Sequence, residues 1–217
     1  MFKVDFHSHT KASKDCLSDP AAVIKTARRR GLTHLVITDH NSIQGALEAK
    51  QIAPDFIIVG EEIMTTRGEI LAAFVQEEIP AGLPPVKVAQ LLKQQNAFIS
   101  LSHPFDIHRS GNWKTEEMEE LLPYLDAVEG FNSRCVNPEF NQKALEFSHA
   151  HGLPFTVGSD SHSLIEVARS YLELPPFQNS DELRKSIRAA KPVTRISSPL
   201  VHLTSRYSVM VKKIQRA

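Results

Sequence analysis

Short apolar runs rich in Val, Ile and Phe recur along the whole chain, and their length and spacing constrain the fold more than any other feature. Each run is about as long as a β-strand, and most are apolar at every position, as expected for strands buried on both faces. They cover residues 2–6, 34–38, 56–60, 69–75, 97–101, 126–131, 154–158 and 170–174. The chain is therefore predicted to form a largely buried sheet.

Helices are predicted between several of these strands because the flanking residues match helix ends. Asp19 can cap a helix that has proline at its first position and that Gly31 stops. The segment from Asn137 to Gly152 repeats this order of residue types, and further helices are predicted at 86–96 and 180–190. Strand followed by helix, repeated, is typical of a parallel sheet with helical crossovers.

An open doubly wound sheet and a closed or distorted barrel both fit this α/β alternation. Neither a Gly-rich dinucleotide loop nor a P-loop follows any predicted strand, so the usual signature of the open sheet is missing. At 217 residues the chain suits a single domain, 1–217, with a helical and basic tail at about 200–217.

Composition argues against several classes of protein. Lys plus Arg and Asp plus Glu both number 25, so there is no chain-wide basic field to recruit nucleic acid. The tail holds four basic residues, interpreted as a solvated helix face: Arg206, Lys212, Lys213 and Arg216. Cys16 and Cys135 are too few for a disulfide framework, which favours a cytoplasmic location. No run approaches the roughly 18 apolar residues of a membrane span, and no obligate protein partner is evident.

Acidic residues and histidines cluster directly after the predicted strands, where parallel sheets and barrels place their active sites. In chain order they are His7, His9 and Asp15; Asp39 and His40; Glu61 and Glu62; His103; Asn132; and Asp160 and His162. Imidazole and carboxylate together suit Zn, Mn or Fe, whereas an all-oxygen set would suit Mg or Ca. Because no thiolate is needed, a catalytic rather than a structural metal centre is predicted.

The number of candidate ligands favours more than one ion. Residues two apart in an extended segment project to the same side, so His7 and His9 can bind one ion together. The whole set exceeds what one ion needs, which favours two or three divalent ions sharing a carboxylate, an arrangement suited to phosphoryl chemistry. Asp39 is interpreted as an orienting carboxylate. Of Glu61 and Glu62, one must point inward and the other away, and ligand chemistry does not say which.

Five short motifs together resemble the polymerase and histidinol phosphatase (PHP) domain superfamily. They are DFHSHT, ITDHNS, GEEI, SHPFD and GSDSH, in that order, and the resemblance runs from about Val4 to Leu174. It implies a distorted seven-stranded β/α barrel, similar to a TIM barrel, with two or three Zn, Mn or Fe ions at the carboxyl ends of the strands.

The resemblance also implies how the ligands are shared among the ions. It suggests a first site from His7, His9, Glu62 and Asp160, a second in which Glu62 bridges to an ion held by His103, and a third from Asp15, His40 and His162. It favours Glu62 over Glu61 because the family carboxylate stands two residues after a glycine, here Gly60. Asn132 stands where some members place His or Cys, and an amide donates far more weakly to a metal.

The leading functional hypothesis is hydrolysis of a phosphate mono- or diester by a hydroxide that bridges the ions. The expected catalytic residues are His7, His9, Glu62, Asp160 and His162. Candidate phosphate clamps are Arg134, Arg109 and Arg169, and His108 is the candidate proton donor to the leaving group. The expected substrate is a small phosphorylated molecule or a nucleotide or oligonucleotide end. The segment between Glu62 and His103 is too short for the inserted subdomain of the family's bisphosphatase and exoribonuclease type.

Two other functions stay open. Amidohydrolases, which cleave C–N or C–O bonds, also have a His-x-His pair on their first strand, although the GSDSH motif and the pairing of Asp15 with His40 favour the phosphatase pattern. A metal-bound domain without turnover, acting as a binding or regulatory module, has the same ligands.

Overall fold

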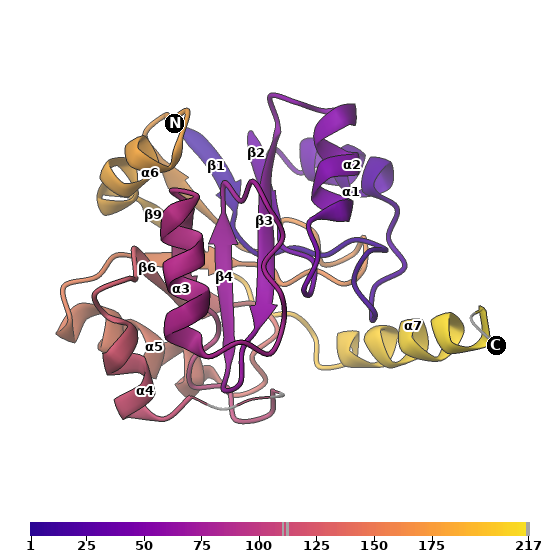
Figure 1. Ribbon diagram of the computed structural model, residues 1–217. Helices are drawn as coiled ribbons and strands as arrows, with labels where there is room; N and C mark the ends of the chain where they lie inside the picture. The colour runs from indigo at the N-terminus through magenta and orange to yellow at the C-terminus, as the bar shows by residue number, and fades with distance from the viewer. Residues whose placement is uncertain (110, 112, 216–217) are drawn as a thin grey trace.

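The computed structural model describes residues 1–109, 111 and 113–215, and its centre is a strongly curved sheet (Figure 1). The strands are β1 (Phe2–Asp5), β2 (His34–Ile37), β3 (Ile57–Met64), β4 (Glu69–Ala73), β5 (Phe98–Leu101), β6 (Ala127–Asn132), β7 (Phe155–Gly158), β8 (Tyr171–Leu174) and β9 (Lys191–Val193). Their order across the sheet is β7-β6-β5-β4-β3-β2-β1-β8-β9. The first seven strands therefore lie side by side in chain order.

The sheet closes on itself where the end of β1 meets the end of β7. The amide of Phe6 donates to the carbonyl of Val157 at 3.2 Å, and the amide of Asp160 donates to the carbonyl of His7 at 2.8 Å. The first three residues of β1 pair instead with β8, and β8 pairs on its other side with β9. The predicted distorted barrel is thus confirmed over β1 to β7, and β8 and β9 extend the sheet beyond it.

The prediction of a parallel sheet is wrong for β4, which runs antiparallel to both β3 and β5. A tight turn joins β3 to β4, in which the amide of Thr65 donates to the carbonyl of Gly68 at 3.1 Å. A connection this short allows only an antiparallel pair, since a parallel pair needs a crossover. As a result, the first residue of β4, Glu69, lies at the edge where the neighbouring strands end.

The helices are α1 (Pro20–Arg29), α2 (Gln44–Ile52), α3 (Pro85–Gln94), α4 (Thr115–Leu121), α5 (Pro138–Ala150), α6 (Ser180–Ser186) and α7 (Val201–Gln215), with a 3-10 turn at Ile187–Ala189. The predicted caps are present: Asp19 accepts from the amide of Ala21 at 3.0 Å, and Asn137 accepts from that of Glu139 at 3.0 Å. Helix α2 was not predicted, because no side chain caps its start after Ile43.

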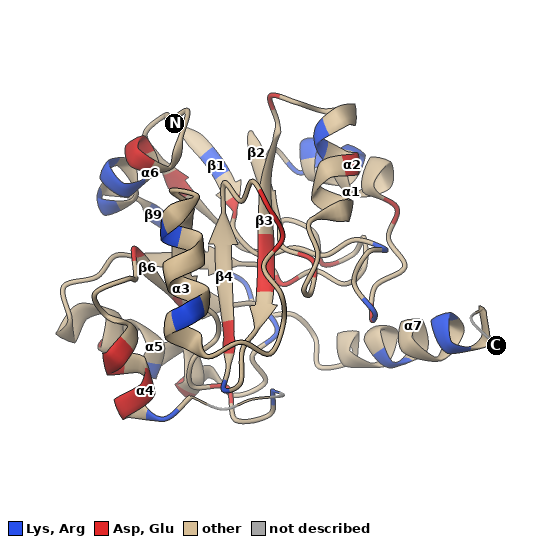
Figure 2. Ribbon diagram, in the orientation of Figure 1, with Lys and Arg blue, Asp and Glu red and all other residues tan. Residues whose placement is uncertain are grey.

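Helix α7 forms the predicted tail and projects from the barrel (Figure 1). Its Lys212 donates to the carbonyls of Lys11 and Ser13, which ties the helix to the loop after β1. Figure 2 shows Lys and Arg spread over α1, α3, α6 and α7 instead of gathered on one element. Arg216 lies outside the described residues. Among the helices described, none is long and apolar enough to cross a membrane.

Candidate metal centre

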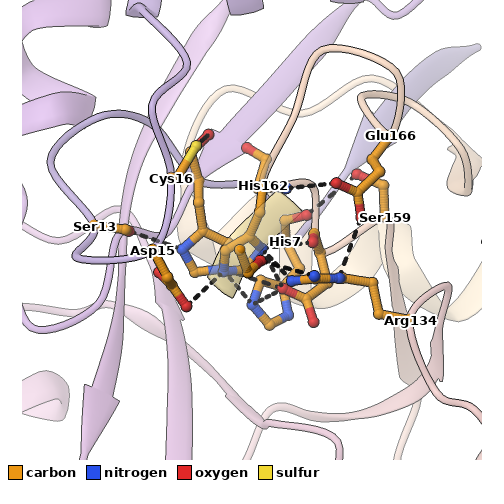
Figure 3. A network of polar contacts seen from close by, with 12 residues as sticks. His7, Ser13, Asp15, Cys16, Arg134, Ser159, His162 and Glu166 are labelled. Atoms are coloured by element: carbon orange, nitrogen blue, oxygen red, sulfur yellow. Dashed lines mark hydrogen bonds and ion pairs between the residues drawn. The ribbon is translucent and has the colours of Figure 1, made fainter. Parts of the chain in front are cut away.

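The predicted ligands meet at one end of the barrel, where β1, β2, β3, β5, β6 and β7 end and β4 begins. Figure 3 shows three of them, His7, Asp15 and His162, close together in one polar network. The first strand delivers His7 and His9, both fully buried. The residues that join them there are Asp15, His40, Glu62, His103, Asn132, Asp160 and His162, of which Asp15 and His40 are the more exposed. The structure therefore brings together every predicted ligand.

Four ligand atoms converge on one point in this cluster. The Nε2 atoms of His7 and His9 lie 3.1 Å apart. Glu62 Oε2 lies 3.2 and 3.4 Å from these nitrogens, and Asp160 Oδ1 lies 3.5 and 3.3 Å from them. A tetrahedral zinc ion with ligands at about 2.0–2.1 Å separates them by about 3.3–3.4 Å, because a tetrahedral edge is roughly 1.63 bond lengths. The five separations that involve an imidazole nitrogen are therefore close to those of one ion's coordination shell, and the ligand atoms of His7, His9 and Glu62 all lie within 4.8 Å of one another.

Two oxygens that face this point have no hydrogen-bond partner. Glu62 Oε2 and Asp160 Oδ1 are both buried, and neither accepts a hydrogen bond. Buried anionic oxygens without a donor are costly unless a cation compensates their charge. The donor set and its unpaired oxygens thus fit a divalent metal ion.

The two histidines of this group are held in one tautomer by acceptors behind them. His7 Nδ1 donates to Glu129 Oε1 at 2.8 Å, so its Nε2 lone pair faces the cluster. His9 Nδ1 contacts Ser13 Oγ at 3.0 Å, and that hydroxyl donates to Asp39 Oδ1 at 2.5 Å. The orienting role predicted for Asp39 agrees with these contacts.

Burial and neighbouring charges shift the pKa values of the ligands in both directions. Against burial, nearby carboxylates raise the pKa values of His7, His40 and His103, so metal binding would displace protons from these imidazoles. Burial lowers the pKa of His9 to about 4, so this imidazole is neutral at neutral pH. Burial opposes ionisation of Glu62, but His7 and the other imidazoles hold the pKa of Glu62 well below its ordinary value. Against burial, Arg109 and His7 likewise hold the pKa of Asp160 well below its ordinary value. A neutral imidazole and two carboxylates are therefore available as ligands.

A second group of ligand atoms lies beside the first, on the side of β5. Glu62 Oε1 lies 3.1 Å from His103 Nε2, so the two Glu62 oxygens face different groups. Glu69 Oε2 lies 3.4 Å from the same nitrogen, and Glu69 was not predicted. It was missed because residues at the start of a strand were expected to lie at the opposite end of a parallel sheet.

A third group stands where the cluster opens to solvent. Asp15 Oδ2 lies 3.3 Å from His162 Nε2 and 3.6 Å from His40 Nε2. The side chains of Asp15 and His40 are 18% and 12% exposed. His9, His40 and His162 are also close enough to share an ion. This group is therefore the part of the predicted ligand set that is most accessible to solvent.

The backbone is strained at two of the candidate ligands. His103 has φ +21° and Asp160 has φ +50°, a region that costs non-glycine residues of the order of 1–3 kcal/mol. The amide of His103 donates to Glu129 Oε2 at 2.8 Å, which helps to hold this conformation. Strain of this kind concentrates at functional sites.

Asn132 lies in the cluster but turns its oxygen away from it. Its Nδ2 donates to both carboxylate oxygens of Glu129, at 3.3 Å each, and to Asp160 Oδ2 at 3.2 Å. Its Oδ1 accepts from the amide of Arg134 at 2.8 Å. An amide nitrogen has no lone pair for a cation, so in this arrangement Asn132 positions carboxylates instead of binding metal.

Arg134 is buried, and its donors are engaged within the protein (Figure 3). One terminal nitrogen contacts His162 Nδ1 at 2.7 Å, and Nε contacts Glu166 Oε1 at 3.1 Å. The other terminal nitrogen donates to the carbonyl of Val201 and to Ser205 Oγ in α7. Arg134 therefore ties His162 to α7 and does not have the free donors expected of a phosphate clamp.

The other three predicted substrate residues are Arg109, Arg169 and His108. Within the described part of the chain, only Arg109 among them contacts a residue of the metal-ligand cluster. It donates to Asp160 Oδ2 and, at 3.2 Å, to Asp106 Oδ2, and its side chain is 17% exposed. Arg169 donates instead to the carbonyl of Ile196. His108 is exposed, with its ring 5.7 Å from that of Phe140.

Neither cysteine is placed to act as a nucleophile. Both Cys16 and Cys135 are buried and unpaired in any disulfide. Burial raises the pKa of Cys16 to about 11 and raises that of Cys135 further. Both thiols are therefore protonated at neutral pH, in agreement with a centre built from imidazoles and carboxylates.

Gly158, at the end of β7, is predicted to be required for the position of His7. A Cβ added there would lie 2.3 Å from the Cβ of His7 and 2.8 Å from Glu129 Oε1. Gly158→Ala should lower the free energy of unfolding by about 1–3 kcal/mol and weaken metal binding. Urea unfolding and metal titration measure the two effects.

Gly130→Ala is the matched control, because a Cβ there would meet Leu145 and Phe155 instead of the cluster. It should lower stability by a similar amount and leave metal affinity unchanged. Equal losses of metal affinity in both variants would contradict the role assigned to Gly158.

Comparison with known proteins agrees with the motifs. A family model described as PHP-associated matches residues 138–192. The uncharacterized protein MJ0417 of Methanocaldococcus jannaschii is 36% identical over 174 residues, which cover 79% of this chain and 70% of the relative. The chain belongs to the PHP domain superfamily.

Solved structures share the fold at lower identity. A two-domain protein from Bacteroides vulgatus, described as containing a predicted PHP-like metal-dependent phosphoesterase, matches with a TM-score of 0.73 and 20% identity over 95% of this chain and 69% of that one. The lesion-specific endonuclease PfuEndoQ from Pyrococcus furiosus matches with a TM-score of 0.60 and 15% identity over 91% of this chain and 59% of that one.

Proposed function

We propose that the protein is a metal-dependent phosphoesterase that hydrolyses a phosphate mono- or diester at a centre of two or three divalent ions of Zn, Mn or Fe. The observation that carries this proposal is the approach of Glu62 Oε2 and Asp160 Oδ1 to within 3.2–3.5 Å of the Nε2 atoms of His7 and His9, which are themselves 3.1 Å apart. The name of the Bacteroides vulgatus neighbour supports the same reaction class.

Each group of ligands would hold one ion. The first comprises His7, His9, Glu62 and Asp160; the second contains Glu62 and His103; the third comprises Asp15, His40 and His162. When bound, the ions supply acidified water and compensate the negative charge of the phosphate oxygens. The carboxylate of Glu62 faces both of the first two groups, so it would fix the spacing between their ions.

Arg109 is the proposed phosphate-binding side chain. Its guanidinium lies between Asp160 and Asp106, at the partly exposed side of the cluster. Donors not used by these carboxylates can reach a phosphate oxygen, and guanidinium matches phosphate geometry. Arg109 would thus orient the ester and offset charge that develops on phosphorus-bound oxygens.

An open groove of 480 Å³ beside His162 would receive the organic group of the ester. Leu203 and Tyr207 of α7 line it and are 57% and 58% exposed.

Tyr207→Ala is predicted to raise KM for an aromatic ester such as 4-nitrophenyl phosphate by about tenfold, with kcat little changed, since stacking contributes about 1–3 kcal/mol. The matched control is Met210→Ala, on the same helix but not among the lining residues. An unchanged KM in Tyr207→Ala would argue against this role.

The substrate class is tested by a hydrolysis screen of the metal-loaded protein. The panel contains phosphomonoesters, mononucleotides, bisphosphates, short oligonucleotides and amide substrates, with His7→Ala as the inactive control. Phosphate release or phosphodiester cleavage that His7→Ala abolishes is the expected result. Amide hydrolysis lost in His7→Ala, without phosphate release, would favour an amidohydrolase. Metal binding without any turnover would favour a binding or regulatory module.

A further inference from the structure

We propose that Glu69 is a metal ligand and completes the second ion site together with Glu62 and His103. This inference rests on the metal centre of the proposed function and adds a residue that lies outside the five sequence motifs. It also explains how the second site can exist although Asn132 offers it no oxygen.

The geometry of the second site matches that of the first. His103 Nε2 lies 3.1 Å from Glu62 Oε1 and 3.4 Å from Glu69 Oε2. These separations fall within the 3.1 to 3.5 Å found among the four atoms of the first site. An ion between them would take one imidazole and two carboxylates, a donor set suited to Zn, Mn or Fe.

The carboxylate of Glu69 is buried in surroundings where its negative charge must be compensated by a positive one. Its side chain is only 8% exposed, and its described contacts are to two imidazoles, His103 at 3.4 Å and His40 at 3.5 Å. Oxygens of Glu62 and Glu69 also lie within 4.8 Å of each other around His40. Two buried carboxylates this close repel each other unless a cation lies between them.

The antiparallel direction of β4 is what brings Glu69 to this position. The tight turn after β3 reverses the chain, so that Met64 and Glu69 are paired across the two strands. Glu69 therefore lies on the strand next to that of Glu62 and two residue positions further along the direction of β3, while the side chain of Asn132 turns to Glu129 and Asp160. The carboxylate of Glu69 would thus supply to the second ion site the oxygen ligand that the amide of Asn132 does not supply.

The rival interpretation is that Glu69 only orients His40 and His103 as a counter-ion. The two interpretations differ in the number of ions bound. Glu69→Gln keeps the shape of the side chain and removes its charge, and Glu61→Gln is the matched control because Glu61 is also buried but faces away, accepting from the amide of Ile79 at 3.0 Å.

The experiment measures ions bound per chain, and their affinities, by mass spectrometry of metals after equilibrium dialysis with Mn or Zn. Glu69→Gln should bind one ion fewer than the wild type at metal concentrations that saturate the wild type, while Glu61→Gln matches the wild type. An orienting carboxylate would instead leave the number of ions unchanged and only weaken their binding. Spin coupling between Mn ions in the wild type, seen by electron paramagnetic resonance, should disappear in Glu69→Gln.

Glu69→Asp keeps the negative charge, and it is the second test variant to use if Glu69→Gln fails to fold. It should bind all the ions, with one of them weakened. Wild-type stoichiometry in a folded Glu69→Gln, with or without a loss of affinity, would overturn the proposal, and so would wild-type affinity for every ion in Glu69→Asp. Because binding is measured without a substrate, a wild type that binds metal but hydrolyses nothing would refute the proposed function and leave the Glu69 assignment standing. A wild type that binds no metal would refute both.

Discussion

Glu62→Gln is expected to lower phosphoester hydrolysis by at least about 10³-fold, equivalent to roughly 4 kcal/mol of transition-state stabilisation. The carboxylate of Glu62 lies within 3.4 Å of four imidazoles, those of His7, His9, His40 and His103. A neutral amide can neither bridge two ions nor balance these imidazoles. Steady-state kinetics on the best ester from the substrate screen measures the effect on kcat/KM.

Glu61→Gln is the control for this variant, since it makes the same change one residue earlier on β3. Glu61 faces away from the cluster, and burial raises its pKa to about 8, so its side chain is largely neutral at pH 7. We expect its activity to stay within about threefold of the wild type. Equal losses in the two variants would mean that β3 had been disturbed as a whole.

Glu129→Gln is expected to weaken metal binding by about 10- to 100-fold, the usual effect of losing a carboxylate that orients a metal-binding histidine. Glu129 accepts from His7 Nδ1 at 2.8 Å and from the amide of His103 at 2.8 Å, so it holds residues of two sites at once. Titration of the metal-free protein with Zn or Mn measures the change in Kd.

Glu173→Gln is the control, because Glu173 pairs with Lys3 at 3.2 Å on the surface. Its metal affinity should equal that of the wild type. A Glu129→Gln protein that binds metal as tightly as the wild type would show that His7 is held by other contacts.

The local signals of the strands and helices were sufficient to predict an α/β alternation, which fits both an open sheet and a barrel, and the resemblance to the PHP superfamily favoured the barrel. The apolar runs matched strands β1 to β8, and Asp19 and Asn137 capped the predicted helices. Strand direction was harder to predict. The reversal at Thr65–Gly68 depends on a turn that lacks a strong sequence signature, so β4 was expected to be parallel.

The same reversal explains one residue that the site prediction missed. Ligands were sought after the ends of strands, which finds His103 after β5 but not Glu69 at the start of β4. Glu129 was missed for another reason, since it lies inside β6 and supports ligands from behind. The sequence signal that could have identified Glu129 is that it is a charged residue within an otherwise apolar strand. For Arg134, sequence proximity to a strand end could not reveal that His162 and α7 occupy its donors.

The most direct test of a metal-dependent phosphoesterase is phosphate release by one preparation before chelation, after chelation and after stepwise reloading with Zn, Mn or Fe. Hydrolysis is predicted to fall by at least about 10²-fold on chelation and to return in proportion to the ions rebound, with no recovery in Glu62→Gln. Full activity in protein shown to be free of metal would contradict the proposed chemistry.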